Sequence, residues 1–241
     1  MNIAIIFAGG SGVRMRTGKP KQFLEISGKP IIIHTLDNFQ NCSLIDKIYI
    51  SCKKEYIEKL EKMIKQFGIT KVCGITEGGK NGQESIYNGL KLALSENQRD
   101  SIVLLHDGVR PFINEEVIEK NILSVKQYGN AVTCTPFIET PVISKNGNIV
   151  EQMPLKRETF TAQAPQSFYL GDIVEAHEEI RKINPEYIDI VDSCNLYINL
   201  GRKMHIVEGN RGNIKVTTPE DFYILRALLQ YRENEQILGM W

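Results

Sequence analysis

The sequence has no excess of charge of either sign, no long apolar run and no paired cysteines, and each absence excludes a class of protein. Its 29 basic and 29 acidic residues give a formal net charge of zero, so no nucleic-acid partner is indicated and any anion site must be local. The longest apolar runs, such as residues 3–8 and 102–105, are far too short to cross a bilayer. Met1 leads into a strand rather than a basic signal segment, so we expect a cytoplasmic protein with no membrane partner.

Residues that commonly hold metals or form disulfides are few. The five cysteines are an odd number at scattered spacings, without a C-x-x-C pair, which argues against a disulfide framework and against a zinc knuckle. The four histidines show no metal-ligand spacing either. We therefore interpret the cysteines as buried free thiols and the histidines as structural, with only His106 close to the expected site.

What the chain does contain is a regular alternation of strands and helices. Short apolar runs predict the strands, and apolar residues at helical spacing predict the helices between them. This alternation favours a mostly parallel sheet with helices on both faces, and we expect a single domain over residues 1–241. The expected strands are residues 3–8, 47–52, 70–75, 101–105, 131–137, 197–200 and 203–207, and the expected helices are 31–39, 55–67, 85–94, 114–127, 169–182 and 219–231.

The first strand opens into a loop rich in glycine and positive charge. Three glycines follow the buried run, and Arg14, Lys19 and Lys21 come close behind. Backbone amides together with these cations can neutralise a multiply charged phosphate ligand. The spacing is not that of a P-loop, since no Gly-Lys-Ser/Thr follows, and Met15 occupies the third glycine position of the G-x-G-x-x-G fingerprint. A Rossmann dehydrogenase is therefore disfavoured.

Two further stretches place polar groups where expected strands end. Residues 77–82 form a second glycine loop, and Asp107 follows the buried strand at 101–105. A carboxylate at the carboxyl end of a buried strand is where open α/β sheets place their ligand chemistry. Capping of the helix that follows is the structural alternative for Asp107.

Between residues 139 and 160 the strand and helix alternation stops. Residues 140–144, a turn at 145–148 and residues 149–152 predict a β-hairpin that projects from the sheet. Projecting arms often dimerise, so the arm, residues 138–160, is our candidate interface. A plain surface hairpin explains the pattern equally well.

Several sequence blocks together resemble the cytidylyltransferases that make CDP-activated alditol phosphates, which include the ribitol-5-phosphate and 2-C-methyl-D-erythritol 4-phosphate enzymes. The blocks occur in family order over nearly the whole chain, and the first and third look closer to the ribitol-5-phosphate branch. They are AGGSGVRM at 8–15, PKQF at 20–23, HDGVRPF at 106–112, APQSF at 164–168, EG at 208–209 and NIKVT at 213–217.

The resemblance implies a three-layer Rossmann-like nucleotidyltransferase with a mostly parallel twisted sheet and a protruding β-hairpin dimerisation arm. It implies that an acceptor phosphate attacks the α-phosphorus of CTP and that magnesium pyrophosphate leaves. By match to the family, Arg14, Lys21 and Lys215 are catalytic, and Asp107 holds or orients Mg²⁺. The nucleotide-binding residues would be Ala8, Gly9, Gly10, Ser11, Gly12, Val13, Gly79, Ser85, Asp107 and Gly108.

The resemblance also implies an acceptor site that two subunits share. Arg110, Arg157 and Asp192 match acceptor-binding positions, and Thr140 matches an arm threonine that reaches into the partner's acceptor pocket. A homodimer through the arm is therefore expected. Ordinary surface pairing is the alternative for the two arginines, and a solvated charge is the alternative for Lys215.

The chain also departs from the family pattern. Gly82 stands where the second glycine loop usually has an arginine, which changes the expected cytosine pocket, and Glu139 replaces an aspartate before Thr140. Ala164 and Val191 replace two threonines near the acceptor. Because two hydroxyls are lost, we hypothesise that the acceptor differs and could be a smaller alditol phosphate such as glycerol phosphate.

The sequence therefore predicts a magnesium-dependent enzyme that transfers a cytidylyl group from CTP to ribitol 5-phosphate or a related, smaller polyol phosphate. One alternative is a 2-C-methyl-D-erythritol 4-phosphate cytidylyltransferase. The product of the first enzyme would serve a wall or capsule polymer, and the product of this alternative would serve isoprenoid synthesis. An alternative of another class is a nucleotide-binding regulator without catalysis, which the missing loop arginine supports and the retained Arg14, Lys21, Asp107 and Lys215 oppose.

Overall fold

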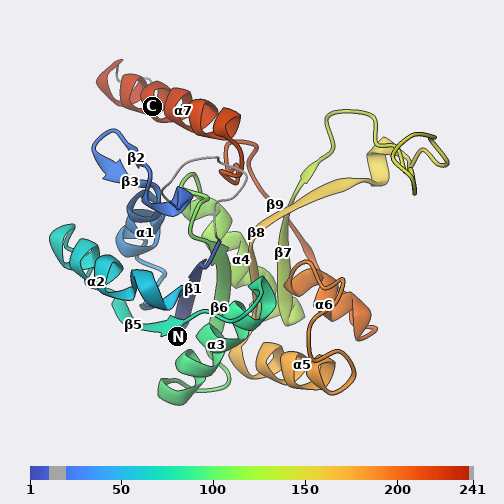
Figure 1. Ribbon diagram of the computed structural model, residues 1–241, viewed down its shortest axis with the longest axis horizontal. Coiled ribbons are helices and arrows are strands. Elements are labelled where there is room, and N and C mark those ends of the chain that lie inside the picture. The colour runs from blue at the N-terminus through green and yellow to red at the C-terminus, as the bar shows by residue number, and fades with distance from the viewer. Residues whose placement is uncertain (11–19, 239–241) are drawn as a thin grey trace.

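A seven-stranded sheet forms the centre of the protein, with strand order β5-β4-β1-β6-β8-β7-β9 (Figure 1). The computed structural model describes residues 1–10 and 20–238. A second, two-stranded sheet pairs β2 (Glu25–Ile26) with β3 (Lys29–Pro30). The strands of the large sheet are β1 (Asn2–Ala8), β4 (Lys47–Cys52), β5 (Val72–Glu77), β6 (Ile102–Asp107), β7 (Asn130–Pro136), β8 (Phe160–Tyr169) and β9 (Ile206–Glu208).

The large sheet is mostly parallel, as the alternating pattern predicted. β1 pairs in parallel with β4 and β6, β4 with β5, and β7 with β9. The exception is β8, which runs antiparallel to both of its neighbours, β6 and β7.

Strand β8 was not predicted, because Pro165 interrupts its apolar pattern and proline normally argues against a central strand. The structure accommodates the proline at a bulge. Val132 of β7 pairs with Gln166, whereas Cys134 pairs with Ala162, so residues 163–165 of β8 face a single residue of β7. Prolines inside sheets occur at such bulges because no ladder hydrogen bond is needed there.

Helices cover both faces of the large sheet, which gives the predicted three layers. In β1, Ala4 and Ile6 belong to a core cluster with α1, α2 and α4, while Ile3 and Ile5 belong to a second cluster with α3, α5 and α6. Successive strand residues point to opposite faces, so a strand covered on both sides must be apolar throughout. The helices are α1 (Ile31–Asn41), α2 (Ile57–Gln66), α3 (Gly82–Glu96), α4 (Glu115–Tyr128), α5 (Leu170–Ile183), α6 (Ser193–Asn199) and α7 (Pro219–Leu238).

Side-chain caps fix where three of the helices begin. Asn114 caps α4 as predicted, by accepting a hydrogen bond of 3.2 Å from the Val117 amide. Asn81 and Asp192 cap α3 and α6 in the same way. The expected strand at 197–200 is wrong, since Tyr197 lies in α6; a short apolar run does not distinguish a strand from a buried helical turn.

The arm extends away from the sheet, at the upper right of Figure 1. The predicted extended strands of its hairpin are not formed. One bridge joins Ile143 to Gln152, and the Asn146 side chain accepts hydrogen bonds from the Asn148 and Ile149 amides in the turn. Its exposed apolar side chains are Ile138, Val142, Ile143, Ile149, Val150, Met153, Leu155 and Phe160. In the described part of the chain, no helix is both long enough and apolar enough to span a bilayer.

A buried hydrogen-bond network fixes β8 against β7 and α4. The Thr133 hydroxyl donates to the Pro165 carbonyl (2.7 Å) and accepts from the Asn121 amide (2.9 Å). The Asn121 carbonyl accepts from the Ser167 hydroxyl (2.9 Å). Since all of these side chains are buried, a missing member would leave a polar group without a partner.

We expect Thr133→Val to lower the free energy of unfolding by about 1–3 kcal/mol, because the Pro165 carbonyl would lose its donor at nearly unchanged side-chain volume. Urea unfolding measures the change. The control is Thr135→Val on the same strand, since the Thr135 hydroxyl makes no hydrogen bond to the described residues. An equal loss in the two variants would contradict a stabilising role for the network.

Candidate active site

A cavity of about 630 Å³ opens at the carboxyl edge of the parallel strands. Residues at or just beyond the ends of β1, β4 and β6 line it, together with the glycine loop after β5 and the middle of β8. Ligands of open α/β sheets bind at this edge. The described residues that carry charge into it are Lys21, Lys53, Lys80, Arg110, Lys215, Asp107 and Asp192.

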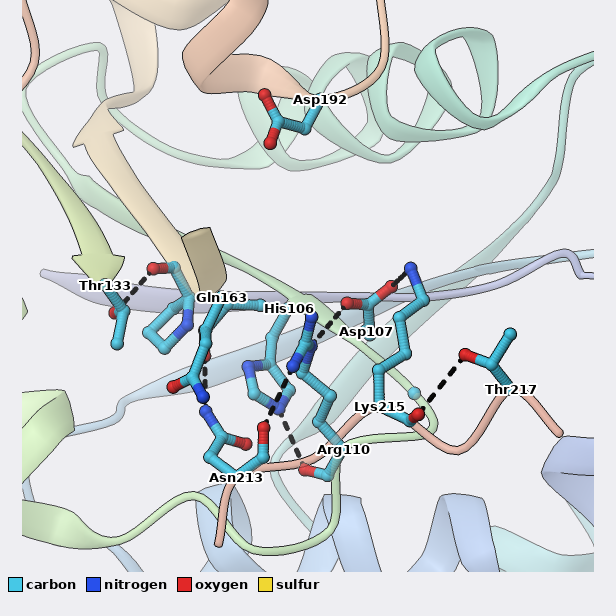
Figure 2. A network of polar contacts seen from close by, with 12 residues as sticks. His106, Asp107, Arg110, Thr133, Gln163, Asp192, Asn213, Lys215 and Thr217 are labelled. Carbon is cyan, nitrogen blue, oxygen red and sulfur yellow. Dashed lines mark hydrogen bonds and ion pairs between the residues drawn. The ribbon is translucent and has the colours of Figure 1, made fainter. Parts of the chain in front are cut away.

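Asp107 ends β6 and joins two cations. One carboxylate oxygen, Oδ1, lies 2.6 Å from Lys215 Nζ, and the other, Oδ2, lies 2.8 Å from Arg110 Nε. Arg110 also donates from Nη1 to the Asn213 carbonyl at 2.9 Å. Figure 2 shows that these contacts tie the end of β6 to the segment that carries Lys215. Asp107 is therefore an ion-pair partner in the site, and the cap of the following helix is Asn114 instead.

The two cations keep Asp107 ionised. Burial by itself raises the pKa of this carboxyl, but Lys215 and Arg110 together outweigh the burial and lower the pKa to about 2. Burial lowers the pKa of the neighbouring His106 to about 4, so the imidazole is neutral at physiological pH. Its Nε2 lies 3.0 Å from the Arg110 carbonyl, to which it donates a hydrogen bond. His106 thus has a structural role, as predicted, because it stabilises the turn that carries Arg110.

The loop after β1 contributes backbone and a buried lysine. Gly9, Gly10 and Lys21 line the cavity, and Lys21 is almost completely buried. The Ala8 carbonyl accepts a hydrogen bond of 2.8 Å from the Gln22 amide. The predicted residues Ser11, Gly12, Val13 and Arg14 lie outside the described part of the chain.

Gly108 continues the same edge, where its amide donates to the Phe7 carbonyl at 3.0 Å. A side chain at this position would come within 3.3 Å of that carbonyl oxygen. The glycine therefore allows the backbone after β6 to approach β1 closely.

The second glycine loop lies next to the first. Gly79 and Ser85, which the family resemblance assigned to nucleotide binding, both line the cavity. The Ser85 hydroxyl accepts from the Gly79 amide (3.0 Å) and donates to the Asn81 carbonyl (2.8 Å). Asn81 Oδ1 accepts from the Glu84 amide, while the Glu84 carboxylate accepts from the Lys80 amide. These contacts of the cap residue Asn81 and of Glu84 fix the loop at the start of α3.

The predicted acceptor-binding residues fall into two groups. Arg110 and Asp192 line the cavity. Thr140 and Arg157 are exposed on the arm and do not line it, and Arg157 Nε lies 3.5 Å from Glu158. A single chain therefore brings together only part of the predicted acceptor site.

The sequence reasoning missed several residues that line the cavity, including Lys53, Lys80, Gln163 and Gln166. Lys53 could have been found from strand pairing: Ala8 pairs with Cys52, so the residue after β4 must lie beside Gly9. The described lining residues carry five cations and two carboxylates, although the whole chain has zero net charge. The local excess of positive charge suits a polyphosphate.

The residues at this site fit a magnesium ion that arrives with a polyphosphate. Among the described residues, no group of three or more His, Cys, Asp or Glu side chains could hold a metal. Mg²⁺ usually keeps several waters and binds through one or two carboxylates plus substrate phosphates. Asp107 would supply one such carboxylate in a cavity whose described charged residues are mostly cations.

Comparison with known proteins identifies the family. The model described as "IspD: 2-C-methyl-D-erythritol 4-phosphate cytidylyltransferase" matches residues 2–231. The ribitol-5-phosphate cytidylyltransferase of Streptococcus agalactiae serotype III is 47% identical over 241 residues, which is 100% of both chains. The 2-C-methyl-D-erythritol 4-phosphate cytidylyltransferase of Clostridium botulinum (strain 657) is 35% identical, over 95% of this chain and 97% of that protein.

A solved structure shows the same fold. It is the 4-diphosphocytidyl-2C-methyl-D-erythritolsynthase of Anaerococcus prevotii, which superposes with a TM-score of 0.80 at 28% identity and covers 95% of this chain and 96% of its own. The expected nucleotidyltransferase fold is thus confirmed. Because the family model covers nearly the whole sequence and full-length relatives match it end to end, the chain belongs to the IspD family of cytidylyltransferases and is a CTP-dependent nucleotidyltransferase.

Proposed function

We propose that the protein transfers the cytidylyl group of CTP to ribitol 5-phosphate, giving CDP-ribitol and pyrophosphate. The observation that carries the proposal is the Asp107 ion-pair network, in which Arg110 and Lys215 face a cavity whose described charged residues are mostly cations. Similarity supports the acceptor, since identity is 47% to a ribitol-5-phosphate enzyme and 35% to a methylerythritol phosphate enzyme.

The reaction needs positioning and charge neutralisation rather than a covalent nucleophile. An oxygen of the acceptor phosphate forms a bond to the α-phosphorus of CTP, and the bond from that phosphorus to the pyrophosphate oxygen breaks. Lys21 and Lys215 would stabilise the charge that builds on the α-phosphate, and Arg110 would hold the acceptor phosphate. Preorganised cations in a partly enclosed site contribute strongly to this kind of reaction.

Magnesium is part of the proposal, with Asp107 as its protein ligand. When bound, the ion would neutralise the triphosphate and the departing pyrophosphate. Both Asp107 oxygens already contact cations, at 2.6 Å and 2.8 Å. Lys215 and Arg110 therefore hold the carboxylate in a fixed orientation at the cavity.

We also propose that the active enzyme is a homodimer through the arm. Apolar side chains are exposed along the arm, among them Val142 (53%) and Met153 (63%). Thr140 and Arg157 lie outside the cavity of their own chain. Burial of the apolar residues by a second copy would stabilise a dimer and could bring these two residues to the partner's cavity.

The acceptor can be tested directly with a pyrophosphate-release assay using CTP and ribitol 5-phosphate, methylerythritol phosphate or glycerol 3-phosphate. We expect the highest kcat/KM with ribitol 5-phosphate. A higher value with glycerol 3-phosphate would support the smaller acceptor that the loss of two threonines suggested. CTP binding without pyrophosphate release for any acceptor would favour the regulator, and equal use of UTP would contradict cytidylyl specificity.

Lys215→Met should reduce kcat/KM by about 10²–10³-fold, because it removes a cation from the developing charge. The variant should remain folded, since 43% of the Lys215 side chain is exposed, and circular dichroism checks this. The matched control is Lys91→Met, an exposed α3 lysine outside the cavity. Similar activity in the two variants would exclude a catalytic role for Lys215.

Charge on the arm should separate the subunits. We expect Val142→Asp with Met153→Asp to shift the protein to monomers in sedimentation velocity and to abolish activity, because burial of either carboxylate in an apolar interface is unfavourable. Ile183→Asp is the control, since Ile183 is 75% exposed but lies at the end of α5. A wild-type protein that is monomeric and active would overturn the dimer proposal.

Mixing two inactive variants tests whether the subunits share a site. In a dimer of Thr140→Ala with Lys215→Met, one of the two sites contains both native residues. Random mixing should therefore restore up to about one quarter of wild-type activity, since half of the dimers are mixed. No recovery, with mixed dimers present, would show that Thr140 acts within its own chain.

A further inference from the structure

The glutamines of the cavity differ in how the protein satisfies them. Among the described residues, those that line it are Gln22, Gln83, Gln163 and Gln166. Gln22 and Gln163 each donate to a backbone carbonyl, at 2.8 Å and 3.1 Å, and Gln166 donates to Asp192 Oδ2 at 3.0 Å. The side-chain amide of Gln83, in contrast, makes no hydrogen bond to the described residues.

Gln83 is also deeply buried. Only 4% of the residue is exposed, and its Oε1 is sealed from solvent without a partner. Removal of an amide from water without a compensating hydrogen bond is unfavourable. Because Gln83 lines the cavity, a bound substrate can supply the partner that the protein does not provide. An amide both donates and accepts, as does a hydroxyl group.

The first turn of α3 presents its side chains to two different parts of the cavity. Ser85 lies toward the ends of β1 and β5, since a side chain at Gly9 or Gly78 would come within 3.4 Å or 3.0 Å of its Oγ. Gln83 lies about 200° away around the helix and shares a face with Ile86. Ile86 packs in the core cluster with α5 and α6, so this face of α3 is directed away from the two glycine loops.

The loop between α5 and α6 lies against the start of α3. Asn81, the cap of α3, donates from Nδ2 to the Glu186 carbonyl in this loop at 3.0 Å. The loop leads to Val191 and Asp192, which line the cavity, and Asp192 matches an acceptor-binding position. The location of Gln83 thus favours the acceptor over the nucleotide.

We propose that Gln83 is a specificity-determining residue whose amide hydrogen-bonds a hydroxyl of the acceptor's polyol chain. Ile86 and Val191, which also line the cavity, carry no hydrogen-bonding group and contact the carbon chain. A neutral amide binds a neutral hydroxyl, while the phosphates are attracted to the cations of the cavity. This inference rests on the proposed function, since it requires a polyol phosphate as acceptor.

Gln83→Met tests the inference, because it removes both hydrogen-bonding groups at similar side-chain volume. We expect kcat/KM for ribitol 5-phosphate to fall roughly 3- to 10-fold, the effect of one lost neutral hydrogen bond, with the KM for CTP unchanged. Tm should stay the same or rise, because an apolar group replaces a buried polar group that has no protein partner. Steady-state kinetics and thermal unfolding measure these changes.

Analogues of ribitol 5-phosphate that each lack one hydroxyl identify the contact. We expect wild-type protein to use at least one analogue less well than ribitol 5-phosphate, and the Gln83→Met variant to use that analogue and ribitol 5-phosphate equally. A preference that is unchanged for every analogue, together with a lower Tm, would show that Gln83 is structural and would overturn the inference. A raised KM for CTP with unchanged acceptor use would assign Gln83 to the nucleotide and would also overturn it.

The matched control is Gln40→Met on α1, outside the cavity. Gln40 Oε1 accepts from the Thr70 and Lys71 amides, both at 2.9 Å, so this variant should lower Tm and leave the kinetics unchanged. If wild-type protein did not use ribitol 5-phosphate, the proposed function alone would fail, and the variants would be compared on the polyol phosphate that reacts best. If no polyol phosphate reacted, both proposals would fail.

Discussion

The contact of Asp107 with Lys215 and Arg110 is the interaction on which the cavity depends. Apolar burial is enough to position β6, but the segment that follows β9 forms no strand or helix that would fix it. Polar contacts to the turn after β6 help to hold that segment: Lys215 contacts Asp107, Arg110 donates to the Asn213 carbonyl, and the Val216 amide donates to the Val109 carbonyl at 3.0 Å. Because Asp107 is buried and ionised, loss of one cation would leave a partly uncompensated charge in the site. The same pairs thus shape the cavity and keep its cations in place.

Strand β8 lines another part of the cavity. Among the described strands, only β8 runs antiparallel to its neighbours in the large sheet, and its bulge at residues 163–165 turns a stretch of backbone toward the segment after β9. The Asn213 amide donates to the Ala164 carbonyl at 2.7 Å, and Gln163 donates to the Asn210 carbonyl at 3.1 Å. Both contacts join β8 to the segment that carries Lys215, so these two walls of the cavity are mechanically connected.

Much of this arrangement could be predicted from the sequence. The remainder depends on contacts between distant segments, which a local sequence pattern does not contain. The apolar runs of β1, β4 and β6 and the cap at Asn114 depend on neighbouring residues, and they were found. β8 was missed because Pro165 argues against a strand. The bulge that accommodates this proline is defined only by the pairing of β8 with β7. The extended arm strands were wrong, since residues 140–152 lack a surface in their own chain to pack on. The pairing of Lys215 with Asp107 joins distant segments; family likeness assigned both residues to the site, but their ion pair was not predicted.

The buried network around Thr133 has a consequence for how this enzyme could change during evolution. Asn121 belongs to α4 and does not line the cavity, yet it is linked through Thr133 to the Pro165 carbonyl, next to Gln166. A substitution at Asn121 would alter the packing of β8 at its bulge and, through Gln166, the position of Asp192. Under the proposed function, a new acceptor preference could thus arise from a helix that contributes no residue to the described lining of the cavity, without replacement of any residue in the site.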